Sequence, residues 1–172
     1  VSFFLFTVGG MLMFVVAIFT AIIVIGFLTP AIMRELQLRH YPELALDGHG
    51  NAFTTLLHSL KYLVITFVLL LVLAPFYFVP VLNIVAINLP FYYLFHKFYL
   101  LDVATTALMK DEYKQMMFFK GNKIRFTTLM LYLIAMIPFA ALVTPVFNVI
   151  ILSHTVFRTK QELLSRSANL QA

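Results

Sequence analysis

The stretch "APFYFVPVLNIVAINLP", residues 74–90, decides the fold of this 172-residue chain. It is almost entirely apolar, yet it contains Pro75, Pro80 and Pro90. Proline removes a backbone donor and disrupts both the interior of a helix and a central strand. The stretch is therefore apolar enough for a membrane core but cannot form one uninterrupted element, which predicts a chain that turns back within it.

The composition points to a membrane environment. Hydrophobic residues make up 62% of the chain and charged residues only 11%, whereas soluble domains are about a quarter charged. Residues 1–33, 62–96 and 126–157 contain no Asp, Glu, Lys or Arg. Each run exceeds the ~18 apolar residues that indicate a bilayer-embedded segment. The sequence therefore predicts an all-α integral membrane protein.

The second run, residues 62–96, has an unusual length. It is too long for one crossing and too short for two, which need about 20 residues each and a turn. We therefore predict a re-entrant, hemi-penetrating helical hairpin that enters the membrane, turns between Pro75 and Pro80 and leaves on the same side. A helix over residues 62–74 would be about 20 Å long, roughly two thirds of the hydrocarbon core.

The third run resembles the second. "KYLVITFVLLLVLAPFYFVPVLNIV" (61–85) and "RFTTLMLYLIAMIPFAALVTPVFNVI" (125–150) both start with a basic residue, reach a Pro-Phe pair and then show Pro-Val-x-Asn. This predicts a second re-entrant hairpin within residues 126–157, turning at Pro138 and Pro145. The alternative is a chance similarity between two proline-broken apolar runs.

Polar segments separate the apolar runs. The predicted single domain starts with a transmembrane helix (1–33), an amphipathic segment (34–61) and the first hairpin (62–96). A basic amphipathic segment (97–125), the second hairpin (126–157) and a tail (158–172) follow. The chain begins inside an apolar run, and we expect a further helix to precede it.

Local signals predict where the helices end. The first helix is expected to end or kink at Thr29–Pro30. Asn51 is expected to cap the helix that follows the turn "DGHGN" (47–51). A surface helix in the basic segment is expected to end at the turn "KGNK" (120–123).

Segments 34–61, 97–125 and 158–172 carry net charges of 0, +3 and +2. This balance agrees with all three lying on one cytoplasmic face.

The order of these elements is similar to that of a known family. A long helix ending in "TPAIM" (29–33), a proline-broken hairpin and "KIRFTTLMLYLIAMIP" (123–138) resemble the CysZ-type sulfate permeases and the wider etoposide-induced membrane protein family. The resemblance implies a multi-pass protein of the bacterial inner (cytoplasmic) membrane with hemi-penetrating helix pairs. It also implies a homo-oligomer that admits sulfate for cysteine biosynthesis. The family's basic Gly-x-Arg-Arg-like motif falls before the start of this chain, and the last hairpin is bulkier here.

Five side chains are candidates for the site. Asn83 and Asn148 follow the second proline of each repeat, and an amide at membrane depth either lines a path or caps broken backbone. Arg34 could meet an anion where the first helix leaves the apolar zone, or extend to lipid headgroups. Lys61 and Arg125 are expected to anchor the hairpins at the headgroups.

The sequence favours transport over catalysis. It has no cysteine and no recognisable catalytic, phosphate-binding or metal-binding motif, so we expect no enzyme, cofactor or metal site. No basic-aromatic platform for nucleic acid lies outside the apolar runs. Those runs also lack the Asp and Glu relays of driven pumps. We therefore predict channel-like uptake of an inorganic anion, with sulfate expected and the lipid bilayer and further copies as partners. The alternative is a non-transporting membrane scaffold or lipid-interacting protein.

Overall fold

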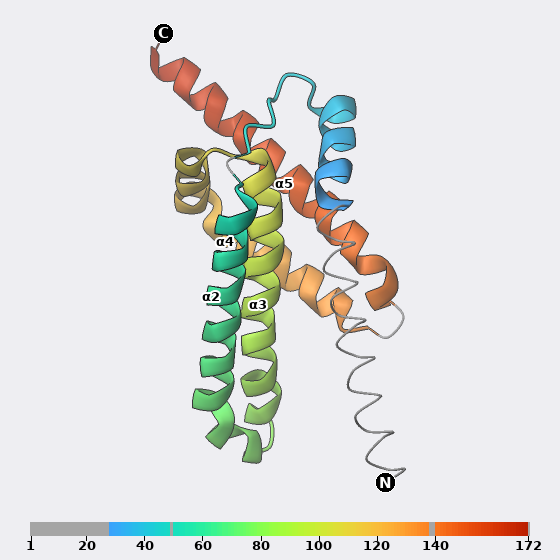
Figure 1. The fold of residues 1–172 in the computed structure, drawn as a ribbon, viewed down its shortest axis with the longest axis vertical. Helices are drawn as coiled ribbons and strands as arrows, with labels where there is room; N and C mark the ends of the chain where they lie inside the picture. Colours follow the sequence, from blue (N-terminus) through green and yellow to red (C-terminus); the bar gives the residue numbers. More distant parts are fainter. Residues whose placement is uncertain (1–27, 49, 138–139, 172) are drawn as a thin grey trace.

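The computed structural model describes residues 28–48, 50–137 and 140–171, and all regular secondary structure in this part is helical (Figure 1). After a helix over residues 28–40, the elements are α2 (Ala52–Leu73), the short 3₁₀ helix η1 (Ala74–Phe78), α3 (Leu82–Ala107), α4 (Lys110–Ala135) and α5 (Ala140–Gln171).

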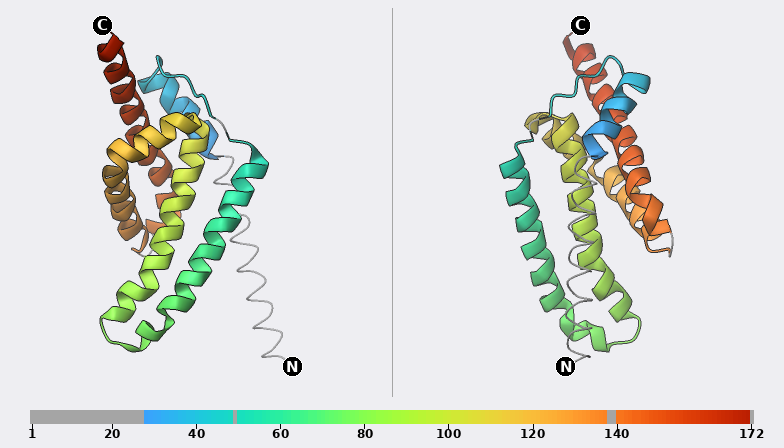
Figure 2. Two further views of the ribbon diagram at one scale, coloured as in Figure 1. Left: turned by 90° about the vertical axis from the view of Figure 1, so that its left-hand side faces the viewer. Right: turned by 45° about the vertical axis from the view of Figure 1, so that its right-hand side comes forward.

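The opening stretch forms the turn of a helical hairpin. α2 ends at Leu73, Pro75 lies in η1, Pro80 lies in the turn that follows, and α3 starts at Leu82. The two helices run antiparallel and side by side (Figures 1 and 2). Among the described elements, α2 packs only against α3 and η1.

The arms of this hairpin are longer than predicted. The Asn51 side chain accepts a hydrogen bond of 3.2 Å from the Phe53 N–H, which confirms the predicted N-cap. From Ala52 to Leu73 the helix is continuous, so the separate short helix expected from residue 62 is wrong. No proline or glycine lies between Asn51 and Ala74, and apolar residues recur at helical spacing throughout.

At ~1.5 Å per residue, the arms of 22 and 26 residues measure about 33 and 39 Å. The segments Phe53–Phe78 and Leu82–Ala107 are both long and apolar enough to cross a membrane. That this hairpin enters and leaves on one side stays a prediction.

The second helix pair breaks between Ala135 and Ala140, a gap that contains one of its two predicted turn residues. α4 ends at Ala135 and α5 starts at Ala140, and Pro138 between them lies outside the described residues. The expected turn at Pro145 is wrong, because this proline lies inside α5. Pro145 lies past the first turn of α5, so its missing N–H removes one helix bond, to the carbonyl of Ala141, and the helix continues through it.

A further predicted helix end is wrong. α4 runs through residues 120–123, although an interior glycine costs about 1 kcal/mol relative to alanine. A Cβ at Gly121 would meet only ordinary contact, 3.8 Å from Met117 Cε, so packing does not require a glycine here. Thr29 and Pro30 lie in the helix of residues 28–40, and the helix predicted to end or kink at that pair falls on residues 1–27, outside the described part.

The core lies where α3, α4, α5 and residues 28–48 meet, at the base of the hairpin (Figure 2). Its large apolar side chains that are at most 1% exposed include Met33, Leu100, Leu108, Met116, Ile124, Leu152 and Phe157. The outer face of α2 is instead an exposed apolar stripe of Phe53, Leu57, Leu60, Val64, Phe67 and Leu71. The molecule is thus a packed base with an apolar helix on its outside.

Candidate functional site

A row of polar side chains is buried along α5. Its members are Thr144, Asn148, Ser153, Thr159 and Lys160. In an apolar helix such groups need hydrogen-bond partners, because an unpaired buried polar group costs about 1–3 kcal/mol. The members that lack a hydrogen-bond partner are therefore candidates for binding a group from outside the chain.

Asn148 has none. It is 1% exposed, and neither its amide oxygen nor its amide nitrogen forms a hydrogen bond with the described part of the chain. The hydroxyl of Tyr99 on α3 interacts with it, but without hydrogen-bond geometry. Of the two roles open to Asn148, no capping bond is seen among the described residues, and the side chain presents a donor and an acceptor within the contact between α3 and α5.

Ser153 is a second buried group of this kind, and the sequence did not single it out as a binding residue. It is fully buried on α5, and its hydroxyl makes no hydrogen bond with the described residues. A serine in an apolar run carries little signal, because serine hydroxyls in helices usually bond to the carbonyl one turn back.

Asn83 is not brought to the same place. It is half-buried in the first turn of α3, where its N–H donates to the Val79 carbonyl at 3.0 Å. Tyr99, the neighbour of Asn148, lies 16 residues further along α3, or about 24 Å. The two asparagines differ because Pro80 precedes α3 whereas Pro145 is incorporated into α5.

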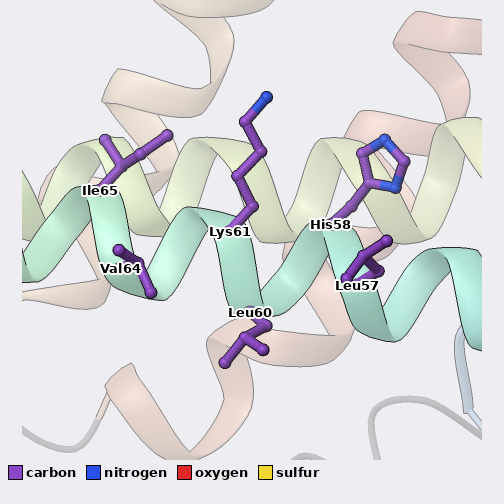
Figure 3. A pocket seen from close by; sticks show the side chains of 6 residues that line it. All are labelled: Leu57, His58, Leu60, Lys61, Val64 and Ile65. Atoms are coloured by element: carbon purple, nitrogen blue, oxygen red, sulfur yellow. The ribbon is translucent and has the colours of Figure 1, made fainter.

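The three basic candidates are exposed on different elements. Arg34 lies on the helix of residues 28–40, Lys61 on α2 and Arg125 on α4, where its guanidinium donates to Asn122 Oδ1 at 3.3 Å. Figure 3 shows Lys61 and His58 projecting from the same side of α2, beside a hollow of about 460 Å³. This hollow is separate from Asn148, since α2 makes no contact with α5.

The most connected polar side chain is one that the sequence placed in the tail. Lys160 is 4% exposed, and its ammonium donates to the carbonyls of Ala45 at 3.0 Å and Ala107 at 3.2 Å. It also pairs with Asp47 at 3.4 Å and with Glu112 at 3.3 Å. Lys160 therefore joins the loop before α2, the end of α3 and the start of α4. Nothing in its local sequence indicates these distant partners.

Hydrogen bonds hold α4 against α3 along a seam. The Tyr92 hydroxyl donates to the Arg125 carbonyl at 2.8 Å, and His96 Nδ1 is hydrogen-bonded to Thr128 Oγ1 at 2.7 Å. Further along, the Tyr132 hydroxyl donates to Asn88 Oδ1 at 2.9 Å. Among the described residues no group of three His, Asp or Glu side chains could hold a metal ion.

Long apolar helices broken at prolines, arranged on an all-helical base, define a helical membrane protein. The chain belongs to the family described as sulfate transporter CysZ/etoposide-induced protein 2.4, which matches residues 1–145. No curated protein and no solved structure matches the chain. The family includes the CysZ sulfate transporters, so its membership connects this fold with membrane transport instead of catalysis.

Proposed function

We propose that this protein is a channel-like permease that admits an inorganic anion, sulfate, across the bacterial inner membrane for cysteine biosynthesis. Family membership supports the class of function. The observation that carries the proposal is Asn148, a buried amide left without a hydrogen-bond partner in the described structure.

An anion that leaves water needs donors to replace its hydration shell, because an unpaired charge in a low-dielectric medium is very costly. The Asn148 amide, with the Tyr99 and Ser153 hydroxyls on the same helix pair, can supply neutral donors. Neutral donors favour passage, since they hold an anion less tightly than a buried cation does. No acidic residue occurs between residues 113 and 161 of α4 and α5, whereas Asp102 lies three residues after Tyr99 on α3 and acts electrostatically on its hydroxyl.

The predicted re-entrant hairpins and homo-oligomer belong to this proposal. Broken helices that meet at membrane depth are typical places for substrate passage. Neighbouring copies would complete the walls of the path, with the exposed Arg34 attracting anions at its mouth.

The test is labelled sulfate uptake into proteoliposomes, with Asn148→Leu as the central variant. Uptake should fall at least tenfold, while the melting temperature should stay the same or rise because an unpaired buried amide is removed. Asn83→Leu in the same assay tests the second predicted path residue. Wild-type uptake no greater than that of empty vesicles would contradict the proposal.

The alternative function, a non-transporting membrane scaffold, is favoured by one observation. The apolar stripe of α2 has no partner among the described elements and could pack against another membrane protein. A reconstituted, folded protein that shows no anion uptake but associates with other membrane proteins through α2 would support this alternative.

A further inference from the structure

A cluster of cations and phenol rings lies where the hairpin meets α4. The ammonium of Lys97 on α3 is 5.9 Å from the ring centroids of both Tyr62 on α2 and Tyr93 on α3. The two rings meet edge to face at 6.3 Å. Cation–π attraction of this kind holds the ammonium in place. We call Tyr62, Tyr93, Lys97 and Arg125 the neck cluster.

Arg125 reaches this cluster from α4. The hydrogen bond from the Tyr92 hydroxyl to the Arg125 carbonyl brings the two helices together at this level. Arg125 lies within electrostatic range of Lys97, and its guanidinium also donates a hydrogen bond to Asn122 Oδ1 at 3.3 Å. Neither cation forms an ion pair within the described residues.

The stretches of chain that carry the cluster contain no carboxylate. No Asp or Glu occurs between residues 48 and 101 or between residues 113 and 161. Together these two intervals cover all of α2 and those parts of α3 and α4 that form the cluster. Asp102, the first acidic residue after Lys97, lies five positions further along α3 and pairs with neither cation. Two repelling cations are therefore held together with no anion among the described residues.

We propose that the neck cluster is an oxyanion site that binds a sulfate- or phosphate-type group. The Arg125 guanidinium supplies paired donors in a planar fork, and Lys97 supplies a point charge. The hydroxyls of Tyr62 and Tyr93 can add neutral donors. Binding an oxyanion removes the repulsion between the two cations, which gives the site its affinity.

Two sources could supply the group. One is a free inorganic oxyanion. The other is the phosphate of an anionic phospholipid, whose acyl chains would lie against the apolar hollow beside Lys61 on α2, lined by Leu57, Leu60, Val64 and Ile65 (Figure 3). The site is distinct from the Asn148 path of the proposed function, because it is built from α2, α3 and α4.

The test compares two double variants that each remove two positive charges. Lys97→Gln with Arg125→Gln removes the cluster but keeps the Arg125 carbonyl that accepts from Tyr92. Lys114→Gln with Lys123→Gln is the matched control, from exposed positions of the same helix α4. The full chain is titrated with sulfate and with phosphate by calorimetry in neutral detergent. It is also melted in nanodiscs of phosphatidylglycerol and of phosphatidylcholine.

A free-oxyanion site predicts saturable sulfate or phosphate binding that weakens at least tenfold in the neck variant only. A lipid site predicts a higher melting temperature in phosphatidylglycerol that the neck variant alone loses. Without anions the neck variant should melt no lower than wild type, since the repulsion is gone. Equal losses in both variants, or no response to sulfate, phosphate or phosphatidylglycerol, would overturn the proposal.

The same experiments separate this site from the proposed function. Asn148→Leu should lose sulfate uptake and keep anion binding at the neck cluster. Absent uptake with intact neck binding would contradict the permease alone.

Discussion

Lys160 on α5 donates a hydrogen bond of 3.2 Å to the carbonyl of Ala107, the last residue of α3. The same ammonium reaches Ala45 and Asp47, which precede α2. One buried side chain thus holds both chain segments that leave the base of the hairpin. A cation at this position also satisfies a carbonyl at the C-terminal end of α3, which carries the negative end of the helix dipole.

Lys160→Met should destabilise the protein by about 1–3 kcal/mol, because it leaves the buried carbonyl of Ala107 without its donor, while the partly exposed Asp47 and Glu112 can be solvated. The measurement is equilibrium unfolding in mixed micelles. Lys123→Met, which removes an exposed lysine, serves as the control and should change stability by less than about 0.5 kcal/mol. Equal losses in the two variants would contradict a clamp at Lys160.

Gly48→Ala should loosen the loop from α3. A Cβ at this position would lie 2.5 Å from the Thr105 carbonyl oxygen and 2.6 Å from that of Thr106, so backbone must move. Gly121→Ala is the matched control, because its Cβ would find only ordinary contact at 3.8 Å. In thermal melts, Gly48→Ala should lower the melting temperature and Gly121→Ala should raise it. The gain in the free energy of unfolding for Gly121→Ala should be up to about 1 kcal/mol.

Val81 has a φ of 71°, a left-handed conformation that is strained for a β-branched residue. Val81→Gly should therefore keep or raise stability, since relief of about 1–3 kcal/mol of strain offsets the flexibility gained. Val79→Gly, two positions away in extended backbone, should lower stability. If both variants fall by the same amount in chemical denaturation, Val81 is not strained.

Thr128→Val keeps the shape of a buried side chain and removes the hydroxyl that bonds to His96. A loss of about 1–3 kcal/mol is expected, because the buried imidazole nitrogen then lacks a partner. Thr127→Val, at the preceding, half-buried position of α4, should be nearly neutral because that hydroxyl donates to the Lys123 carbonyl of its own helix. A neutral Thr128→Val in the same unfolding assay would show that the seam does not depend on this bond.

The pair between Lys120 and Glu162 joins α4 to α5 at 2.8 Å. The hydrogen bond from Lys120 lowers the pKa of Glu162 below its ordinary value of 4.5. A lowered folded-state pKa means that this carboxylate contributes stability above about pH 4.5, which is lost as the pH falls through the folded pKa. The small melting difference between wild type and Glu162→Gln should thus shrink as the pH falls below 4.5 and vanish once the pH is below the lowered folded-state pKa.

The sequence predicted local features well. The helical class, the turn around Pro75 and Pro80 and the Asn51 cap all follow from composition and from backbone chemistry within a few residues. Pro145 was misjudged as a break. A proline inside a helix costs one backbone bond and a contact with the carbonyl four residues earlier, and a continuous α5 that packs against α3 and α4 accommodates that cost.

The site was predicted only in part. Asn148 was named from an expected repeat, but its lack of a partner depends on how α5 faces Tyr99. Lys160 and the neck cluster were missed as units, since their members lie far apart in the chain and meet only through helix packing. Lys61 and Arg125 were each predicted as a separate headgroup anchor. The sequence did not indicate that Arg125 forms the neck cluster with Lys97.

The clamp at Lys160 also sets an order of assembly. Lys160 follows Ala107 by 53 residues and Ala45 by 115. At roughly 5–20 residues per second, the ribosome completes α3 some 3–10 s before it adds Lys160. During that interval the newly made hairpin lacks the contacts of Lys160 at its base. It therefore meets the translocon and the lipid while the segments before α2 and after α3 are still free to separate.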